Sequence, residues 1–167
     1  MKKHVHIIKM GGTIEFIDLA YDAINKNLMK LDTSIDSYLH NLIKPHFNFS
    51  SETVAKKDSR DITQKDRDEL LRAITTTSHD NIIVTHGTFT MSETAEFLDK
   101  QNYGSKKIIL TGSMVPITGF TVSDAGFNLG FAIANFDTIE PGVHICMNGG
   151  TFSASEVSKN LDDFRFE

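Results

Sequence analysis

The chain has 167 residues, of which 40% are hydrophobic and 23% charged, a composition that indicates one globular domain and excludes disordered, collagen-like and coiled-coil proteins. With 17 Lys and Arg against 22 Asp and Glu, the net charge is -5, and no basic run is longer than a pair, so we expect no nucleic-acid partner. No window approaches the roughly 20 apolar residues of a membrane-spanning helix, and the N-terminus does not resemble a signal peptide, so we expect a soluble protein without a membrane partner.

The predicted elements alternate between strands and helices. Short runs rich in β-branched residues predict strands at 4–9, 81–85, 107–111 and 143–147, with a weaker candidate at 50–55. Helical patterns lie at 35–43, 63–76, 93–101 and 124–136. Their candidate caps are Thr33 or Ser34, Thr63, Ser92 and Ser123, and Pro45 ends the first helix. This alternation predicts an α/β fold, a single open parallel sheet of the Rossmann or flavodoxin-like, three-layer type, over residues 1–167.

Cys146 is the only cysteine and lies in the apolar run 143–147. An internal disulfide is therefore impossible, and a buried, inert thiol is the expected state. The absence of disulfides favours a cytoplasmic protein.

Loops rich in Gly, Thr and Ser follow three of the predicted strands, at 11–13, 86–88 and 112–114. In parallel sheets, ligands bind at the carboxyl ends of the strands, so the hydroxyls of Thr13 and Thr88 are expected to face one site. The glycine pair before Thr13 permits close approach to a ligand and offers N–H groups to an oxyanion, although a tight turn without chemistry has the same pattern. A phosphate-binding loop is disfavoured because its glycine and lysine spacing is missing.

The seven histidines do not form a metal-binding pattern in the sequence. His4 and His6 share one strand face but lack a matching third ligand, so no metal and no cofactor are expected. Asp162 and Asp163 are expected to form a solvated turn rather than a catalytic pair.

Several motifs occur in one order along the chain: Gly11-Gly12-Thr13-Ile14, 57–63, Thr85-His86-Gly87-Thr88, 110–116 and Ser123-Asp124. Together with Met147-Asn148-Gly149-Gly150 and Val157-Ser158-Lys159-Asn160, this series resembles the bacterial-type L-asparaginase family, from Ile7 almost to the last residue. The final Arg165-Phe166-Glu167 resembles the end of the short, single-domain members. We therefore expect one domain of the N-terminal asparaginase type at 1–167, without a C-terminal second domain.

The resemblance implies an amidohydrolase that cleaves a side-chain amide through a threonine acyl-enzyme. Thr13 matches the nucleophile, and Thr88 and Lys159 match the groups that move protons. Tyr21 is the candidate for the tyrosine that completes the nucleophile site. Gly12, Ser59 and Gly87 match positions that contact the substrate, with Ser59 at its α-carboxylate.

The sequence departs from the family at Phe89, where the family motif His-Gly-Thr-Asp-Thr-Met has an aspartate that binds the substrate's α-ammonium. Arg60 adds a positive charge at a position next to Ser59, where many relatives have glutamine. Both changes predict poor activity on L-asparagine and favour a related amide without an α-amino group. The alternative is a catalytically impaired protein that binds a small carboxylate or a protein partner; an unrelated nucleotide-binding module is disfavoured.

Oligomerisation is also expected. The family places its active sites near subunit contacts, and 12 phenylalanines supply apolar side chains for an interface as well as for a core. We expect a homodimer or a larger homo-oligomer.

Overall fold

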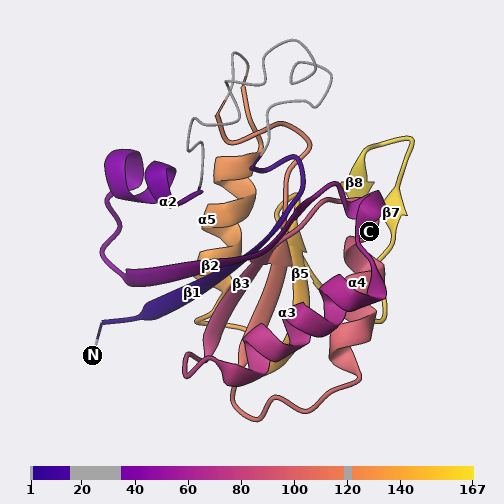
Figure 1. Cartoon of the computed structure of the whole chain (residues 1–167). Coiled ribbons are helices and arrows are strands. Elements are labelled where there is room, and N and C mark those ends of the chain that lie inside the picture. The colour runs from indigo at the N-terminus through magenta and orange to yellow at the C-terminus, as the bar shows by residue number, and fades with distance from the viewer. Residues whose placement is uncertain (1, 16–34, 119–121) are drawn as a thin grey trace.

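A six-stranded sheet forms the centre of the molecule (Figure 1). The computed structural model describes residues 2–15, 35–118 and 122–167. The strand order is β2-β1-β3-β4-β5-β6, in which β1 to β5 pair in parallel and β6 pairs antiparallel with β5. The strands are β1 (His4–Gly11), β2 (Asn48–Lys57), β3 (Asn81–Thr85), β4 (Lys107–Thr111), β5 (Gly142–Met147) and β6 (Gly150–Ser153). This order confirms the predicted α/β fold with an open, mainly parallel sheet.

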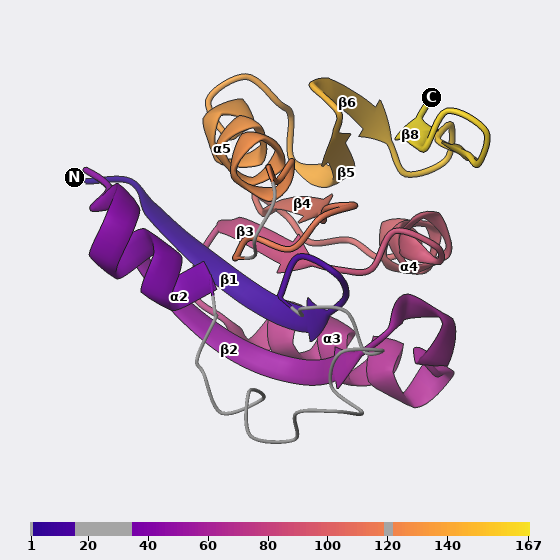
Figure 2. The same cartoon turned by 90° about the horizontal axis from the view of Figure 1, so that it is seen from above.

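Helices cover both faces of the sheet, and Figure 2 shows α2 and α5 on one side and α3 and α4 on the other. The helices are α2 (Ile35–Ser37), α3 (Gln64–Thr76), α4 (Met91–Asp99) and α5 (Ala125–Asn135). Alternate residues of each strand point to opposite faces. On β1, Ile8 therefore packs with the residues of α3 and α4, whereas Ile7 packs with those of α2 and α5.

The predicted bounds of β3 and β4 are confirmed, because both strands are short apolar runs buried on two faces. β1, β2 and β5 are longer than predicted, and β2 extends over ten residues although only 50–55 was expected. β2 is the edge strand, and several of its side chains are polar and exposed, so its sequence carries little apolar signal.

The helix caps agree only in part with the sequence. The capping box at Thr63 is confirmed, since its side chain and that of Asp66 each accept the other residue's backbone N–H. Ser123 accepts the N–H of Ala125 at the start of α5. The prediction that Ser92 caps the next helix is wrong, because α4 begins at Met91 and its N-cap residue is Thr90.

The first predicted helix is α-helical only over Ile35–Ser37 and continues as a π-helix over Tyr38–Ile43. It ends at Ile43, and the C-cap residue Lys44, whose φ of 50 is left-handed, directly precedes Pro45. The candidate caps Thr33 and Ser34 lie outside the described residues.

A small hairpin near the C-terminus was not predicted. It consists of β7 (Lys159–Asn160) and β8 (Arg165–Phe166), and the turn between the strands contains Asp162 and Asp163. Both aspartates are exposed, as expected for a solvated turn. Phe166 is only 3% exposed and joins the core below α3 and α4, which fixes the hairpin to the main sheet.

Candidate active site

The site forms where the direction of the chain connections reverses. β1 lies between β2 and β3, so the loops after β1 and β3 flank this switch point at the carboxyl ends of the strands. Thr13 lies in the loop after β1, and Thr88 lies in the loop after β3.

Two glycines allow these loops to touch. Gly12 has a φ of +81, and a Cβ added to it would lie 2.3 Å from the backbone nitrogen of Gly87. A Cβ on Gly87 would in turn lie 2.7 Å from Cβ and Oγ of Ser59. The absence of side chains at both positions therefore brings the loops that carry Thr13, Thr88 and Ser59 into direct contact.

The N–H of Gly12 donates to the carbonyl oxygen of Lys57 at 2.9 Å. The N–H of Gly12 is therefore already occupied. The expectation that it offers a free donor to an oxyanion is wrong for this residue. What Gly12 contributes is the close approach of the backbone.

Ser59 is 1% exposed and fastens the loop after β3 to the segment after β2. Its hydroxyl accepts the N–H of Phe89 at 3.2 Å, and its carbonyl accepts the hydroxyl of Thr90 at 2.6 Å. The Ser59 hydroxyl still has its own proton to donate.

Lys159 reaches the same place from the β7–β8 hairpin. Its ammonium donates to the hydroxyl oxygen of Thr88 at 2.7 Å. The Thr88 hydroxyl lies 3.7 Å from the sulfur of Met114, a weak acceptor. Burial lowers the pKa of Lys159 below its usual range, because a partly buried ammonium loses hydration. The structure thus brings together two residues 71 positions apart that are both candidates for proton transfer.

Phe89 lies between two cations. The Lys159 nitrogen is 4.1 Å from the centre of its ring, and the Arg60 guanidinium carbon is 4.9 Å from it. Asp58 binds the Arg60 guanidinium through two hydrogen bonds, of 2.9 and 3.1 Å, and these bonds lower the pKa of the Asp58 carboxyl. The ring itself is 48% exposed.

Of the remaining sequence-predicted residues, Thr13 is exposed and joins the cluster through the contact of Gly12 with Gly87. Tyr21 lies outside the described residues. The structure therefore brings the segments of Ser59, Thr88 and Lys159 together, and Thr13 directly follows Gly12, which touches Gly87.

A sequence model described as "Asparaginase, N-terminal" matches residues 4–163. This chain belongs to that family. It is 31% identical over 166 residues to the "Probable L-asparaginase periplasmic" of Haemophilus influenzae, a match that covers 93% of this chain and 46% of that protein. It is also 36% identical over 116 residues to the "Glutaminase-asparaginase" of Acinetobacter glutaminasificans, covering 68% of this chain and 34% of that protein.

Solved structures agree with this assignment. The probable cytoplasmic L-asparaginase from Campylobacter jejuni matches with a TM-score of 0.75 and 28% identity, over 99% of this chain and 53% of that one. The thermostable L-asparaginase from Thermococcus kodakarensis matches with a TM-score of 0.82 and 25% identity, over 99% and 51%. The chain spans about half the length of the relatives it matches.

Two buried side chains that support this asparaginase-family site were not singled out from the sequence. His86 is 0% exposed; its Nδ1 lies 2.8 Å from the carbonyl oxygen of Gly87, and its Nε2 lies 3.0 Å from the Thr94 hydroxyl. Burial lowers the pKa of His86 to about 4, so the ring is neutral and Nδ1–H is the donor to Gly87. Asn128 donates to the carbonyl oxygen of Gly112 and accepts the N–H of Asn148, which joins the loops after β4 and β5. Isolated polar residues in such positions leave no periodic signal.

Glu15, two residues after Thr13, also has a perturbed carboxyl group. Burial raises its pKa to about 7, against the opposing effect of Lys9. Lys9 is 9% exposed and forms an ion pair with Asp36 at the start of α2. Glu15, Lys9 and Asp36 therefore form a group of partly buried ionisable side chains next to the segment that carries Thr13.

The histidines of β1 do have a neighbouring third histidine, which the sequence did not indicate. The rings of His4 and His79 stack with centroids 3.9 Å apart, and His6 lies 5.4 Å from His79. Both ring nitrogens of His6 are occupied, by Ser50 and by Glu52. Among the described residues, no group of three or more His, Cys, Asp or Glu side chains is placed to hold a metal ion.

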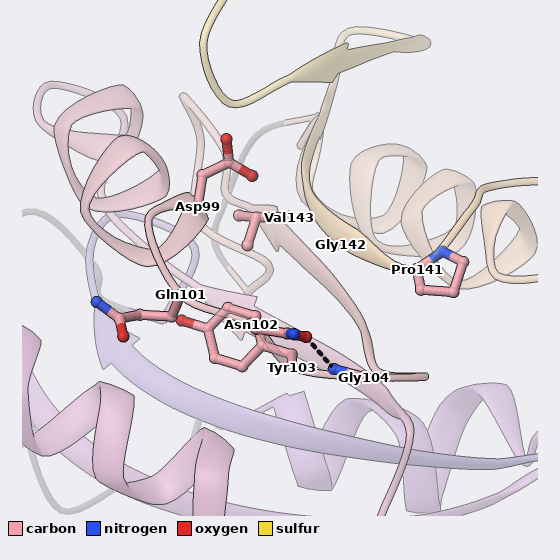
Figure 3. A pocket seen from close by; sticks show the side chains of 8 residues that line it. All are labelled: Asp99, Gln101, Asn102, Tyr103, Gly104, Pro141, Gly142 and Val143. Carbon is pink, nitrogen blue, oxygen red and sulfur yellow. Dashed lines mark hydrogen bonds between the residues drawn. The ribbon is translucent and has the colours of Figure 1, made fainter.

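A separate pocket of about 230 Å³ lies at the opposite edge of the sheet, where β5 begins (Figure 3). Its wall includes Asp99, Tyr103 and Gly142, and the side chain of Asn102 accepts the N–H of Gly104 within it. Because it lies at the amino ends of the strands, it is not part of the cluster around Thr88.

No helix in the described part of the chain combines the length and apolar character needed to cross a membrane.

Proposed function

We propose that this chain is an amidohydrolase that cleaves the side-chain amide of a small carboxylate. The Thr13 oxygen attacks the amide carbonyl carbon, the carbon–nitrogen bond breaks, and the hydroxyl proton leaves with the nitrogen as ammonia. Water then cleaves the threonine ester and releases the acid. The observation that carries this proposal is the hydrogen bond from Lys159 to Thr88, in a loop cluster next to Thr13 and in a chain of the asparaginase family.

Proton transfer falls to Lys159 and Thr88. An ammonium cannot accept a proton, so Lys159 acts as a base only in its neutral form. Burial lowers the pKa of Lys159, which increases the neutral fraction near pH 7. We assign to the Thr88 hydroxyl, 2.7 Å from the lysine nitrogen, the transfer of a proton between the lysine and the reacting group. Tyr21 remains our candidate for completing the nucleophile site.

The substrate we propose carries a carboxylate but no α-ammonium. Ser59 binds the carboxylate, and the subsite for the neighbouring substituent contains the Phe89 ring together with the Arg60 and Lys159 cations. An ammonium in this place would meet Lys159 and the guanidinium of Arg60, whose partner Asp58 is already bound to it. We therefore place L-asparagine among the poor substrates and a monoamide such as succinamate among the good ones.

The same observation favours a second candidate, a protein that binds a small carboxylate without turnover. Phe89 stands where the family motif has the aspartate that binds the α-ammonium. Loss of that aspartate is also what we expect of a family member that has lost activity on L-asparagine and only binds a ligand. Binding and hydrolysis are distinguished by whether a bound amide is converted to the acid.

The first test measures ammonia release from L-asparagine and from succinamate, by wild type and by Thr13→Ala. The second follows the NMR signals of both proteins during titration with the two amides, L-aspartate and ATP. Wild type should release ammonia, and Thr13→Ala should lose at least about a hundredfold of that rate while keeping its fold and ligand-induced shifts. Ligand-induced shifts without ammonia would establish the binding protein instead. Full turnover by Thr13→Ala would remove Thr13 as nucleophile.

We also propose a cytoplasmic location, on the ground of the single buried cysteine. The names of the relatives point in both directions, since one is described as periplasmic and another as cytoplasmic. Cell fractionation with an antibody to the chain decides between them.

A further inference from the structure

The contact between Phe89 and Lys159 is close enough to be an interaction in its own right. The ammonium nitrogen lies 4.1 Å from the ring centre, inside the distance of about 6 Å at which a cation is attracted to the face of an aromatic ring. Elsewhere in the molecule, Lys3 lies 5.6 Å from the centre of the Phe136 ring, a looser contact of the same kind.

Lys159 has few other groups to hold it. In the described part of the chain, its ammonium makes one hydrogen bond, to Thr88, and no ion pair with a carboxylate. Of the charged groups on the neighbouring segments, Arg60 is paired with Asp58, and Arg165 with Glu167 on β8. Asp61, beside Arg60, and Asp162 and Asp163, in the hairpin turn, are exposed. The lysine side chain comes from a hairpin with strands of two residues each, which gives its long stem little support.

We propose that Phe89 is a positioning residue that holds the Lys159 ammonium against Thr88 through the face of its ring. The inference rests on the proposed function for its catalytic consequence, but the contact itself does not depend on turnover. The ring substitutes an uncharged partner for the carboxylate at this position in the family motif. It directs the lysine toward Thr88 without adding a negative charge.

The choice of an uncharged partner has a consequence for proton transfer. A carboxylate beside Lys159 would favour the charged ammonium strongly, whereas a ring favours it weakly. With Phe89 in place, the neutral amine is therefore reached at a lower pH than with a carboxylate there. Burial acts in the same direction, because it lowers the pKa of Lys159.

The contact is tested by NMR of protein labelled at the lysine Cε, with the Lys159 signal assigned from Lys159→Arg. In wild type the Lys159 protons should be shifted upfield by the ring, and Phe89→Leu, which keeps the apolar bulk, should abolish that shift. Phe89→Tyr and Phe89→Trp should retain it. The pKa of Lys159 should fall in Phe89→Leu, which removes the attraction of the ring for the cation, and rise in Phe89→Asp, which adds an anion.

The chain supplies matched controls. Phe127→Leu changes another exposed phenylalanine, on α5, and should leave the Lys159 signal unmoved. The Lys3 signal beside Phe136 should be the same in all Phe89 variants. A Lys159 signal that is identical in wild type and Phe89→Leu, in folded protein, overturns the proposal.

Turnover provides a second readout. With the best amide substrate, Phe89→Leu should lower kcat about two- to fivefold with little change in KM, and Phe89→Tyr should restore it. In each Phe89 variant, the part of the kcat–pH profile that reports Lys159 should shift in the same direction as the Lys159 pKa measured by NMR. If the Lys159 protons are shifted upfield but the protein has no turnover, the contact is supported and the proposed function is refuted. If turnover depends on Thr13 but the Lys159 protons are not shifted, only the contact is refuted.

Discussion

At the scale of single residues, Phe89 separates this chain from the family motif that it otherwise follows. The segment around it is fixed by two contacts, since its N–H donates to the Ser59 hydroxyl and the hydroxyl of the preceding Thr88 accepts from Lys159. Only the side chain differs, and Arg60 adds a second cation beside it. The difference in substrate should therefore be reversible by substitution.

Phe89→Asp should increase ammonia release from L-asparagine. The new carboxylate supplies an anion for the α-ammonium, an effect of about 2–3 kcal/mol or roughly 30- to 150-fold. The double variant with Arg60→Gln should gain more, because the guanidinium no longer repels the ammonium. If neither folded variant exceeds wild type, Phe89 is not what excludes L-asparagine.

A second residue-scale prediction concerns Gly87, whose added Cβ would meet Ser59 at 2.7 Å. Gly87→Ala should force the two loops apart and lower the free energy of unfolding by about 1–3 kcal/mol, with a larger loss of activity. Gly130→Ala is the matched control, because a Cβ on that helical glycine has nothing within 4 Å and should be neutral or stabilising. Thermal unfolding of the two variants is the measurement, and equal melting temperatures would contradict the account.

At the scale of elements, apolar periodicity predicted those parts of the fold that lie in the core. β3, β4 and the capping box of α3 follow directly from local patterns. The hairpin that carries Lys159 has strands too short and too polar to show any period, so only resemblance identified that lysine. His86 contacts Gly87 and Thr94, and Asn128 contacts Gly112 and Asn148; such single polar contacts leave no periodic pattern in the sequence.

The start of α3 provides a prediction about pH. Burial alone would raise the pKa of the Asp66 carboxyl, but hydrogen bonds from Lys57 and Thr63 lower it to about 2. A carboxyl whose pKa is lower in the folded state stabilises the fold above about pH 4, and this contribution disappears as the pH falls toward 2. Asp66→Asn should lower the free energy of unfolding at pH 7 by about 1 kcal/mol and flatten its decline between pH 4 and pH 2. Urea unfolding across that range would contradict this if both proteins declined in parallel.

At the scale of the whole molecule, the domain arrangement and the assembly remain predictions. Phenylalanines that do not enter the core include Phe89, Phe127 and Phe164, each about half exposed or more. Exposed aromatic side chains are common at protein interfaces, so we expect a homodimer as the smallest stable unit. Light scattering at micromolar concentration should give twice the mass of one chain, and a stable monomer would reject the prediction.

The central claim is that this asparaginase-family site hydrolyses amides that lack an α-ammonium. Succinamate and L-asparagine test it directly, because they share the amide and the carboxylate and differ only in the amino group. The measurement is kcat/KM for ammonia release by the wild-type chain, with Thr13→Ala as the blank. Succinamate should be preferred by roughly 30-fold or more, because the ammonium of L-asparagine would have no free anionic partner beside Lys159 and Arg60. Equal or faster cleavage of L-asparagine would contradict it.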